Sequence, residues 1–438
     1  MSDPMLGIVA LGILFVAIFV GFPIAFILIF LSLIFGYIGF GDRAFDLMML
    51  QFYGSIKDPL FVAVPCFLLM GYLMEQAGLM ERMFRGFQLL LASVKGSLYL
   101  AVLVTATIFG AATGIVGSSV TILGIMAGPS MRKSGYDTRL SAGAITAGGT
   151  LGILIPPSIM LVIMGPTIGV PTTELFAAAV FPGLLLSAFY IIYCMVRCHF
   201  QPELGPPLPL EERASSAREV YRELFVGVVP VAVLILAVLG SILAGLATTT
   251  EAAGVGAFGA LVLTIAYRRM TWKRLKEALS QTILVTGMVL FMVAASNLFG
   301  ALFSRLGSAG MITEAVLGLS LPPLVMILSV LVLVFILGWP LEWLPIVIIV
   351  MPIVCPVVRK LGFDLVWFGT VIAVTLQTAW LSPPVALSAY FLKAVVPEWD
   401  LQDIYMGMMQ FLGLQFLGAF VVVFVPPLSL WLPTVLFR

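Results

Sequence analysis

The groups best suited to chemistry in this chain are the backbone, hydroxyl and amide groups that interrupt long apolar runs. Interruptions occur at Thr113-Gly114, at Pro156-Pro157-Ser158, at Gly338-Trp339-Pro340 and at Ser382-Pro383-Pro384. Proline removes a backbone donor and disfavours helix just before it, so carbonyl and amide groups are left unpaired inside an apolar segment. Carbonyl and hydroxyl oxygens are hard ligands that suit Na⁺, whereas free helix amides suit a carboxylate.

These interruptions define the candidate site. We expect Na⁺, as a coupling ion, to be held mainly by the backbone at Thr113, Gly114, Gly152, Pro156, Gly338, Pro340, Thr378 and Ser382. We expect a bound substrate to contact polar side chains beside the same interruptions, namely Ser118, Ser119, Thr150, Ser158, Thr375 and Gln377. The remaining prolines, Pro157, Pro383 and Pro384, are assigned a structural role as helix breaks.

A sequence repeat positions the interruptions. The stretch 129–137 is matched by 356–364, and both copies contain an Arg-Lys pair followed by glycine, an aromatic residue and aspartate. This shift of 227 positions also carries Pro156-Pro157 onto Pro383-Pro384 and Ala111 onto Gly338. A constant shift over about fifty residues predicts two structural halves with the same order of elements.

Composition bounds the class of protein. Of 438 residues, 61% are hydrophobic and 10% are charged, with a mean hydropathy of +1.17. Soluble domains carry about 25% charged residues, so the chain is predicted to be an all-α polytopic membrane protein. A net charge of +1 indicates no nucleic-acid surface. The lone His199, cysteines without disulfide or zinc spacing, and the absence of paired intramembrane carboxylates indicate that the chain is not an enzyme.

The apolar runs predict an inverted repeat. The first half, 1–200, would contain a re-entrant helical hairpin at about 96–131 and a broken helix at about 140–170. A polar cytoplasmic linker, 201–223, would lead to the second half, 224–438, with a hairpin at about 321–358 and a broken helix at about 365–393. An odd number of crossings in each half makes the second half enter from the opposite side.

Several alternatives stay open at this point. The first hairpin could instead be two packed spans with small residues at their contact, and the Pro156-Pro157 break could be a structural kink. Residues 5–41 could form one bent span or two short ones. Glu174 and Glu251 are expected to be helix caps, because Thr248-x-x-Glu251 has capping-box spacing and Thr172-Thr173-Glu174 looks similar; a direct role in ion or proton binding is the alternative.

A family resemblance rests on motifs that run nearly end to end. They are Gly21-Phe-Pro23-Ile-Ala-Phe26, Val64-Pro65-Cys-Phe67, Ile155-Pro-Pro-Ser-Ile159, Ala247-Thr-Thr-Thr-Glu-Ala-Ala253 and Leu381-Ser-Pro-Pro-Val385. In combination they resemble the large membrane subunit of a tripartite ATP-independent periplasmic (TRAP) transporter. The resemblance implies an elevator-type secondary transporter in the lipid of the bacterial inner membrane. It also implies Na⁺-coupled uptake of an organic acid, a small four-helix membrane subunit and a periplasmic substrate-binding protein.

The resemblance is not uniform. The sialic-acid branch of the family carries Ser-Gly-Ser at the first hairpin tip, where this chain has Thr113-Gly114-Ile115. The run from Gln377 to Pro384 looks more like the branch that handles 2-keto acids and related carboxylates. A stand-alone divalent-anion/Na⁺ symporter, which shares hairpins and proline breaks, is the alternative function.

Overall fold

The structure is a computed structural model that describes residues 4–209, 213, 216–383 and 385–437. Its regular elements are all helical across the described residues, and seven of the helices are long and apolar enough to cross a membrane. Shorter apolar helices accompany them, among them one arm of each hairpin, Ser97–Thr113 and Pro323–Leu337. The predicted all-helical, polytopic fold with two helical hairpins and two interrupted helices is confirmed.

The N-terminal apolar run, residues 5–41, forms two separate helices. Helix α1 (Pro4–Val20) and helix α2 (Ile24–Phe40) are joined at Gly21, whose φ of 94° lies in the left-handed region that favours glycine. Amphipathic α3 (Arg43–Lys57), the 3-10 turn η1 (Pro59–Val62), α4 (Ala63–Gln76) and α5 (Leu79–Leu90) follow.

The first hairpin consists of α6 (Ser97–Thr113) and α7 (Val116–Lys133). The chain reverses at Gly114, with φ 63°, and at the extended Ile115. The first interrupted helix follows as α8 (Thr138–Thr150), the turn η2 (Leu151–Ile153) and α9 (Ile159–Ile168), with a cis bond between Pro156 and Pro157. The 29-residue helix α10 (Thr172–Phe200) completes this half.

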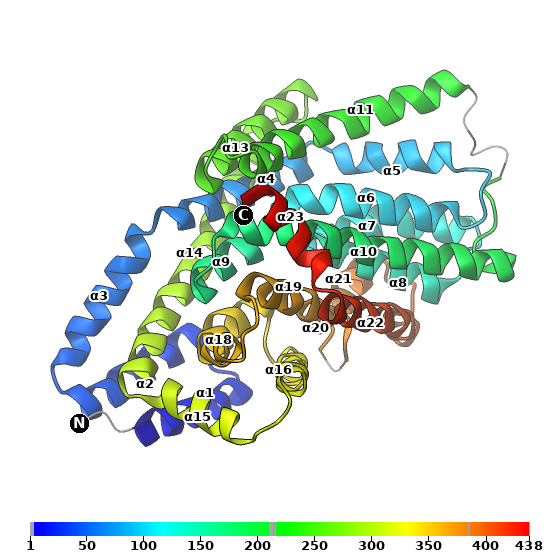
Figure 1. The fold of residues 1–438 in the computed structure, drawn as a ribbon. Helices are drawn as coiled ribbons and strands as arrows, with labels where there is room; N and C mark the ends of the chain where they lie inside the picture. Colours follow the sequence, from blue (N-terminus) through cyan, green and yellow to red (C-terminus); the bar gives the residue numbers. More distant parts are fainter. Residues whose placement is uncertain (1–3, 210–212, 214–215, 384, 438) are drawn as a thin grey trace.

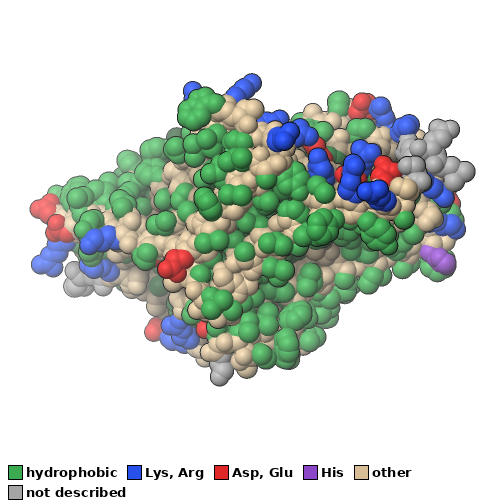
Figure 2. Space-filling view, turned by 90° about the horizontal axis from the view of Figure 1, so that it is seen from above, with side chains coloured by type: hydrophobic (Ala, Val, Ile, Leu, Met, Phe, Trp, Pro, Cys, Tyr) green, Lys and Arg blue, Asp and Glu red, His purple; other side chains and the backbone are tan. Residues whose placement is uncertain are grey.

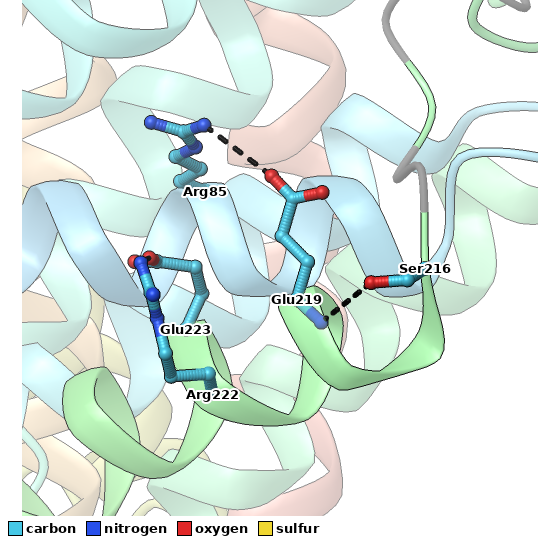
Figure 3. A network of polar contacts seen from close by, with 5 residues as sticks. All are labelled: Arg85, Ser216, Glu219, Arg222 and Glu223. Carbon is cyan, nitrogen blue, oxygen red and sulfur yellow. Dashed lines mark hydrogen bonds and ion pairs between the residues drawn. The ribbon is translucent and has the colours of Figure 1, made fainter.

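The polar segment after α10 ends earlier than the predicted boundary at residue 223. This segment contains a short turn, η3 (Pro202–Leu204). Helix α11 begins at Ala217 because the Ser216 side chain accepts a hydrogen bond from the Glu219 amide. Figure 3 shows this cap, together with the Arg85–Glu219 ion pair of 3.7 Å that joins α11 to α5. The proposed division of the chain into repeats and linker stays a prediction.

Helix α11 (Ala217–Ile235) continues through a π-helical turn (Leu236–Gly240) into α12 (Ser241–Leu243). Helices α13 (Thr249–Ala266), α14 (Trp272–Arg305) and α15 (Ser308–Gly318) follow. The second hairpin has α16 (Pro323–Leu337) as one arm, and α17 (Trp343–Pro345), a π-helical turn (Ile346–Val350) and α18 (Met351–Lys360) as the other.

The second interrupted helix comprises α19 (Leu365–Leu376), α20 (Thr378–Leu381) and α21 (Leu387–Val395). Helices α22 (Leu401–Phe424) and α23 (Pro427–Phe437) close the chain. The repeat is visible in the caps, because Asp137 accepts from the Leu140 amide at 2.7 Å and Asp364, 227 positions later, accepts from the Val366 amide at 2.7 Å. Equivalent aspartates therefore begin both interrupted helices.

The interrupted helices lie at the centre of the molecule. Figure 1 shows α8, α19 and α20 lying among α7, α10 and α22, while α11 and α13 lie along one side and α2, α3 and α14 along another. Helix α4 packs against α13 and α14, and α22 packs against α8. The surface in Figure 2 has a broad hydrophobic band with charged side chains gathered mainly towards its ends, as expected for a membrane-spanning protein.

Candidate functional site

The first hairpin lies directly against the first interrupted helix. A Cβ atom added to Gly110, near the end of α6, would lie 3.0 Å from the Cα atom of Gly152 in η2. The reverse substitution would place a Cβ at Gly152 only 3.3 Å from Gly110. This close approach requires glycine on both sides, and it brings the predicted Na⁺ position Gly152 to the hairpin.

The hydroxyl groups at the first hairpin tip point in two directions. The hydroxyl groups of Thr113 and Ser119 lie 3.2 Å apart and close the tip. Ser118 instead donates a 2.5 Å hydrogen bond to the carboxylate of Glu75 on α4. Thr113 and Ser119, which were predicted to be functional, are therefore brought together, whereas Ser118 links the hairpin to a different helix.

The Pro156-Pro157 break is closed by its own residues. The Ser158 hydroxyl donates to the Ile153 carbonyl across the two prolines, and both residues are almost fully buried. The break therefore satisfies one of its freed carbonyls internally, while the oxygen lone pairs of Ser158 stay available to a ligand. Helix α9 then begins at Ile159, so its N-terminal amides face the break.

The second break has a different construction. Thr375 donates to the Val371 carbonyl at 2.8 Å, and Thr378 donates to the Thr375 carbonyl at 2.6 Å. Among the described residues, the buried hydroxyl of Ser382 has no hydrogen-bond partner. Pro383 lies in the break, and the predicted break residue Pro384 lies outside the described residues. Ser382 thus fits the oxygen-ligand role predicted for it.

The two breaks meet through residues related by the repeat. Thr150, the last residue of α8, approaches the Oε1 atom of Gln377 at 3.2 Å, and these residues are 227 positions apart. Both side chains are fully buried. Thr150 and Gln377 were both predicted to bind substrate, and the structure brings them into contact where the two interrupted helices cross.

The second hairpin tip borders a small cavity of about 120 Å³ against the second break. Its lining includes Gly338, Trp339, Pro340, Glu342, Ala379 and Trp380. A Cβ atom on Gly338 would lie 2.9 Å from that of Ala379, so this tip also approaches its interrupted helix closely. Gly338 and Pro340, both predicted Na⁺ positions, therefore share one cavity.

Sequence analysis missed two carboxylates at the hairpins. Glu342 lines the second-tip cavity and makes no hydrogen bond or ion pair within the described residues. Glu75 lies on α4 and receives the Ser118 hydrogen bond. A signal existed for Glu342, because it is the one charged residue in the stretch 321–358, and ionisable groups inside membrane segments are commonly functional.

The two predicted caps have different outcomes. Glu251 forms the expected capping box, since its carboxylate accepts from the Thr248 amide at 2.8 Å while Thr248 accepts from the Glu251 amide. Helix α10 instead has Pro171 as its N-cap residue, which has no side-chain acceptor. No capping box therefore forms at Glu174, whose carboxylate lies in the first turn of α10, and its assignment as a helix cap stays a prediction.

The donor set of the site suits a hard monovalent cation. The predicted positions offer break carbonyls and the Ser382 and Thr378 hydroxyls, and oxygen ligands of this kind suit Na⁺ better than the soft transition metals. Within the described residues, no group of three or more His, Cys, Asp or Glu side chains could hold a metal ion. Na⁺ binding at these positions stays a prediction.

Comparisons with known proteins extend over most of the chain. A family model described as the DctM component of the tripartite ATP-independent periplasmic transporter matches residues 11–428. The sialic acid TRAP transporter large permease protein SiaM of Vibrio cholerae is 30% identical over 380 residues, which cover 86% of this chain and 87% of that protein. The C4-dicarboxylate TRAP transporter large permease protein DctM of Pseudomonas aeruginosa is 30% identical over 375 residues, covering 85% and 86%.

Two further comparisons bear on substrate diversity and on the fold. The 2,3-diketo-L-gulonate TRAP transporter large permease protein YiaN of Escherichia coli is 27% identical over 368 residues, covering 84% of this chain and 85% of that protein. The crystal structure of the Alcanivorax borkumensis YdaH transporter has a TM-score of 0.64 at 17% identity and covers 90% of each chain, which supports the fold alone. With these matches and its membrane-spanning helices, this chain is a multi-pass membrane protein that belongs to the DctM family of large TRAP transporter permease components.

Proposed function

We propose that this chain imports an organic acid across the bacterial inner membrane by an elevator mechanism driven by a Na⁺ gradient. The observation that carries the proposal is the convergence of two hairpin tips on two interrupted helices, at Gly110–Gly152 and at Gly338–Ala379. Unwound carbonyls beside helix C-termini can hold Na⁺, and helix N-termini can face a substrate carboxylate.

The substrate class is supported by the family. The related permeases are named for sialic acid, C4-dicarboxylates and 2,3-diketo-L-gulonate, all of which are organic acids. In this chain the free amides at the start of α9 and α21 would face the carboxylate. Of the polar side chains predicted for substrate, Ser158 is the N-cap residue of α9, Ser119 lies in the first turn of α7 and Thr375 lies in the last turn of α19. A 2-keto acid is the proposed type.

Na⁺ would bind once in each half. The first site would use the backbone at Thr113, Gly114, Gly152 and Pro156, and the second would use Gly338, Pro340, Thr378 and Ser382. We add Glu342 to the second set because it faces the tip cavity without a partner among the described residues. A membrane potential of 100 mV contributes about 2.3 kcal/mol for each net charge moved inward.

The elevator motion would displace the hairpins and interrupted helices relative to α4, α13 and α14. The contact between these parts is close but involves small groups, since a Cβ on Gly71 of α4 would lie 2.7 Å from the Thr113 carbonyl oxygen. The Ser118–Glu75 hydrogen bond crosses the same boundary. We propose that the parts slide past one another at this boundary, as packed helices do in shear motions.

The family assigns this chain two partners, a small four-helix membrane subunit and a periplasmic substrate-binding protein, and we propose both here. The proposal is tested by uptake into proteoliposomes that contain this chain with the small subunit, supplied with the binding protein and candidate radiolabelled 2-keto acids. Uptake should fall to background when K⁺ replaces Na⁺ at constant membrane potential. Unchanged uptake in K⁺ would refute Na⁺ coupling, and full uptake without either partner would favour a stand-alone symporter.

A further inference from the structure

Four fully buried polar side chains meet where the two interrupted helices cross. Thr150 contacts Gln377 at 3.2 Å and receives a hydrogen bond from the Nε2 atom of Gln415 at 3.4 Å. The Tyr190 hydroxyl faces both Gln415 and Thr150. We call these residues, Thr150, Tyr190, Gln377 and Gln415, the polar node. All four are fully inaccessible in an otherwise apolar interior.

The polar node draws equivalent elements from both halves. Thr150 ends α8 and Gln377 directly follows α19, so each lies at the start of a break. Tyr190 comes from α10 and Gln415 from α22, the long helices that follow the first and second interrupted helices. The node therefore lies where the two halves meet, immediately before both proposed half-sites.

A line of contacts between α8 and α22, which we call the seam, connects the polar node rigidly to the rest of α8. The side chains of Arg139 and Asp403 pair at 2.8 Å, and a Cβ on Gly407 would lie 3.0 Å from the Gly143 nitrogen. Gln415 meets Thr150 farther along the same two helices. Because these contacts advance together along both helices, α8 and α22 run side by side in parallel, and Gln415 moves with the end of α8.

Proton counting shows that the node needs all four members. The Thr150 hydroxyl has a single proton, which the Ala147 carbonyl receives at 2.8 Å. Thr150 can then accept from the amide nitrogens of both glutamines once the Gln377 amide is turned. The amide oxygen of Gln415 has no partner among the described residues, and the hydroxyl of Tyr190, which likewise has none, faces Gln415 and can donate to it.

We propose that Tyr190 and Gln415 are positioning residues that hold the two breaks in a fixed relation, so that a change at one break is transmitted to the other. The functional consequence of this arrangement rests on the function proposed above. The polar node would couple ion binding in one half to ion and substrate binding in the other. Neither residue would touch the ligand. Buried polar networks of this kind impose one arrangement because a partly satisfied network is strongly disfavoured.

The test compares matched variants of the chain assembled with its small subunit in lipid nanodiscs. Gln415→Met and Tyr190→Phe remove the polar atoms of the node at nearly constant shape. Gln410→Met and Tyr193→Phe are the controls, since Tyr193 donates a 2.7 Å hydrogen bond to Gln410 from the same two helices, outside the node. Amide hydrogen exchange is then measured at the two breaks, 151–158 and 382–387.

The expected result is an effect on the opposite half. Gln415→Met should speed exchange at 151–158, and Tyr190→Phe should speed exchange at 382–387, each by about five-fold, the lower end of the usual coupling between two sites. The control variants should leave both breaks unchanged. Faster exchange confined to the half that carries the substitution, or equal effects in node and control variants, would overturn the proposal.

A second measurement separates this inference from the function on which it rests. In the wild type, exchange is compared in NaCl and in choline chloride. If Na⁺ slows exchange at both breaks of the wild type, the node variants should lose that protection at the far break. If Na⁺ has no effect on the wild type, Na⁺ coupling fails, whereas the comparison of variants in choline chloride still decides whether the node positions the breaks.

Discussion

The two hairpin tips occupy equivalent places in the repeat but are stabilised differently. The first tip is held by polar contacts, with Thr113 facing Ser119 and Ser118 bound to Glu75 of α4. The second tip presents Trp339, Pro340 and the unpartnered Glu342 to a cavity within the described residues. From this difference we propose a division of roles, in which the first tip contacts α4 and the second tip offers the Glu342 carboxylate to a cation.

The largest expected effect comes from filling the space between α4 and the first tip. In Gly71→Ala the new methyl group would lie 2.7 Å from the Thr113 carbonyl oxygen, so the tip must shift. Because a side-chain rotation cannot relieve a clash with backbone, we expect uptake to fall by about 100-fold or more, equivalent to ~3 kcal/mol. Gly254→Ala on α13, where an added methyl group meets open space, is the control. Normal uptake by Gly71→Ala would show that the contact tolerates displacement.

The next effect addresses the charge at the second tip. Glu342→Gln keeps the shape of the side chain but removes the carboxylate from the cavity, so we expect uptake at limiting Na⁺ to fall about ten-fold. The apparent affinity for Na⁺ should fall, while saturating Na⁺ should restore much of the rate. Na⁺ titration of uptake in proteoliposomes measures both. An unaltered Na⁺ dependence would remove Glu342 from the proposed ion site.

A smaller effect is expected at the first tip from Ser118→Ala. The substitution removes the hydrogen bond to Glu75 but leaves the Thr113–Ser119 contact intact. A hydrogen bond to a charged group contributes about 1.5–3 kcal/mol, part of which returns when the carboxylate regains water. We expect a two- to five-fold change in the rate of uptake, about the size of a ~1 kcal/mol interaction. A loss as large as that of Gly71→Ala would mean that Ser118 contacts the substrate directly.

The smallest effect concerns stability at the second break. Ala386 begins α21 with a φ of 37°, in the left-handed region that disfavours residues with a Cβ atom. Relief of this strain in Ala386→Gly should stabilise the protein by about 1 kcal/mol, seen as a higher thermal midpoint in detergent. Ala386→Val should lower the midpoint, because branching at Cβ increases the strain. Equal thermal midpoints for both variants would contradict the left-handed backbone conformation of Ala386.

Much of the fold could be predicted because it follows from composition and periodicity. The shift of 227 positions located both hairpins and both breaks, since proline pairs and glycine-rich turns constrain the backbone locally. The contacts between halves could not be predicted in the same way. Gln415 and Tyr190 look like isolated polar residues in apolar helices, and only their tertiary placement joins them to Thr150 and Gln377.

Two differences between the expectation and the structure also have physical causes. Glu174 was compared with Glu251 because both follow threonines, but the residue three positions before Glu174 is Pro171, the N-cap residue of α10, whose side chain has no acceptor oxygen. Ser118 was grouped with Ser119 because both follow the first tip, yet successive residues on a helix point in different directions. One therefore faces Thr113 and the other faces α4.

The seam between α8 and α22 is held at one end by charge. Arg139 pairs with Asp403, and Arg132 pairs with Glu398 at 3.0 Å near the same end. The repeat carries Arg132 onto Arg359, whereas Glu398 is matched by Thr172 after the repeat slips by one residue to a shift of 226, so this pair has no direct counterpart in the repeat. Solvent-exposed pairs weaken as ions screen them over about 8 Å at physiological salt. Ionic strength on the side of the membrane that carries Arg132 and Arg139 would therefore weaken both pairs and loosen this end of the seam.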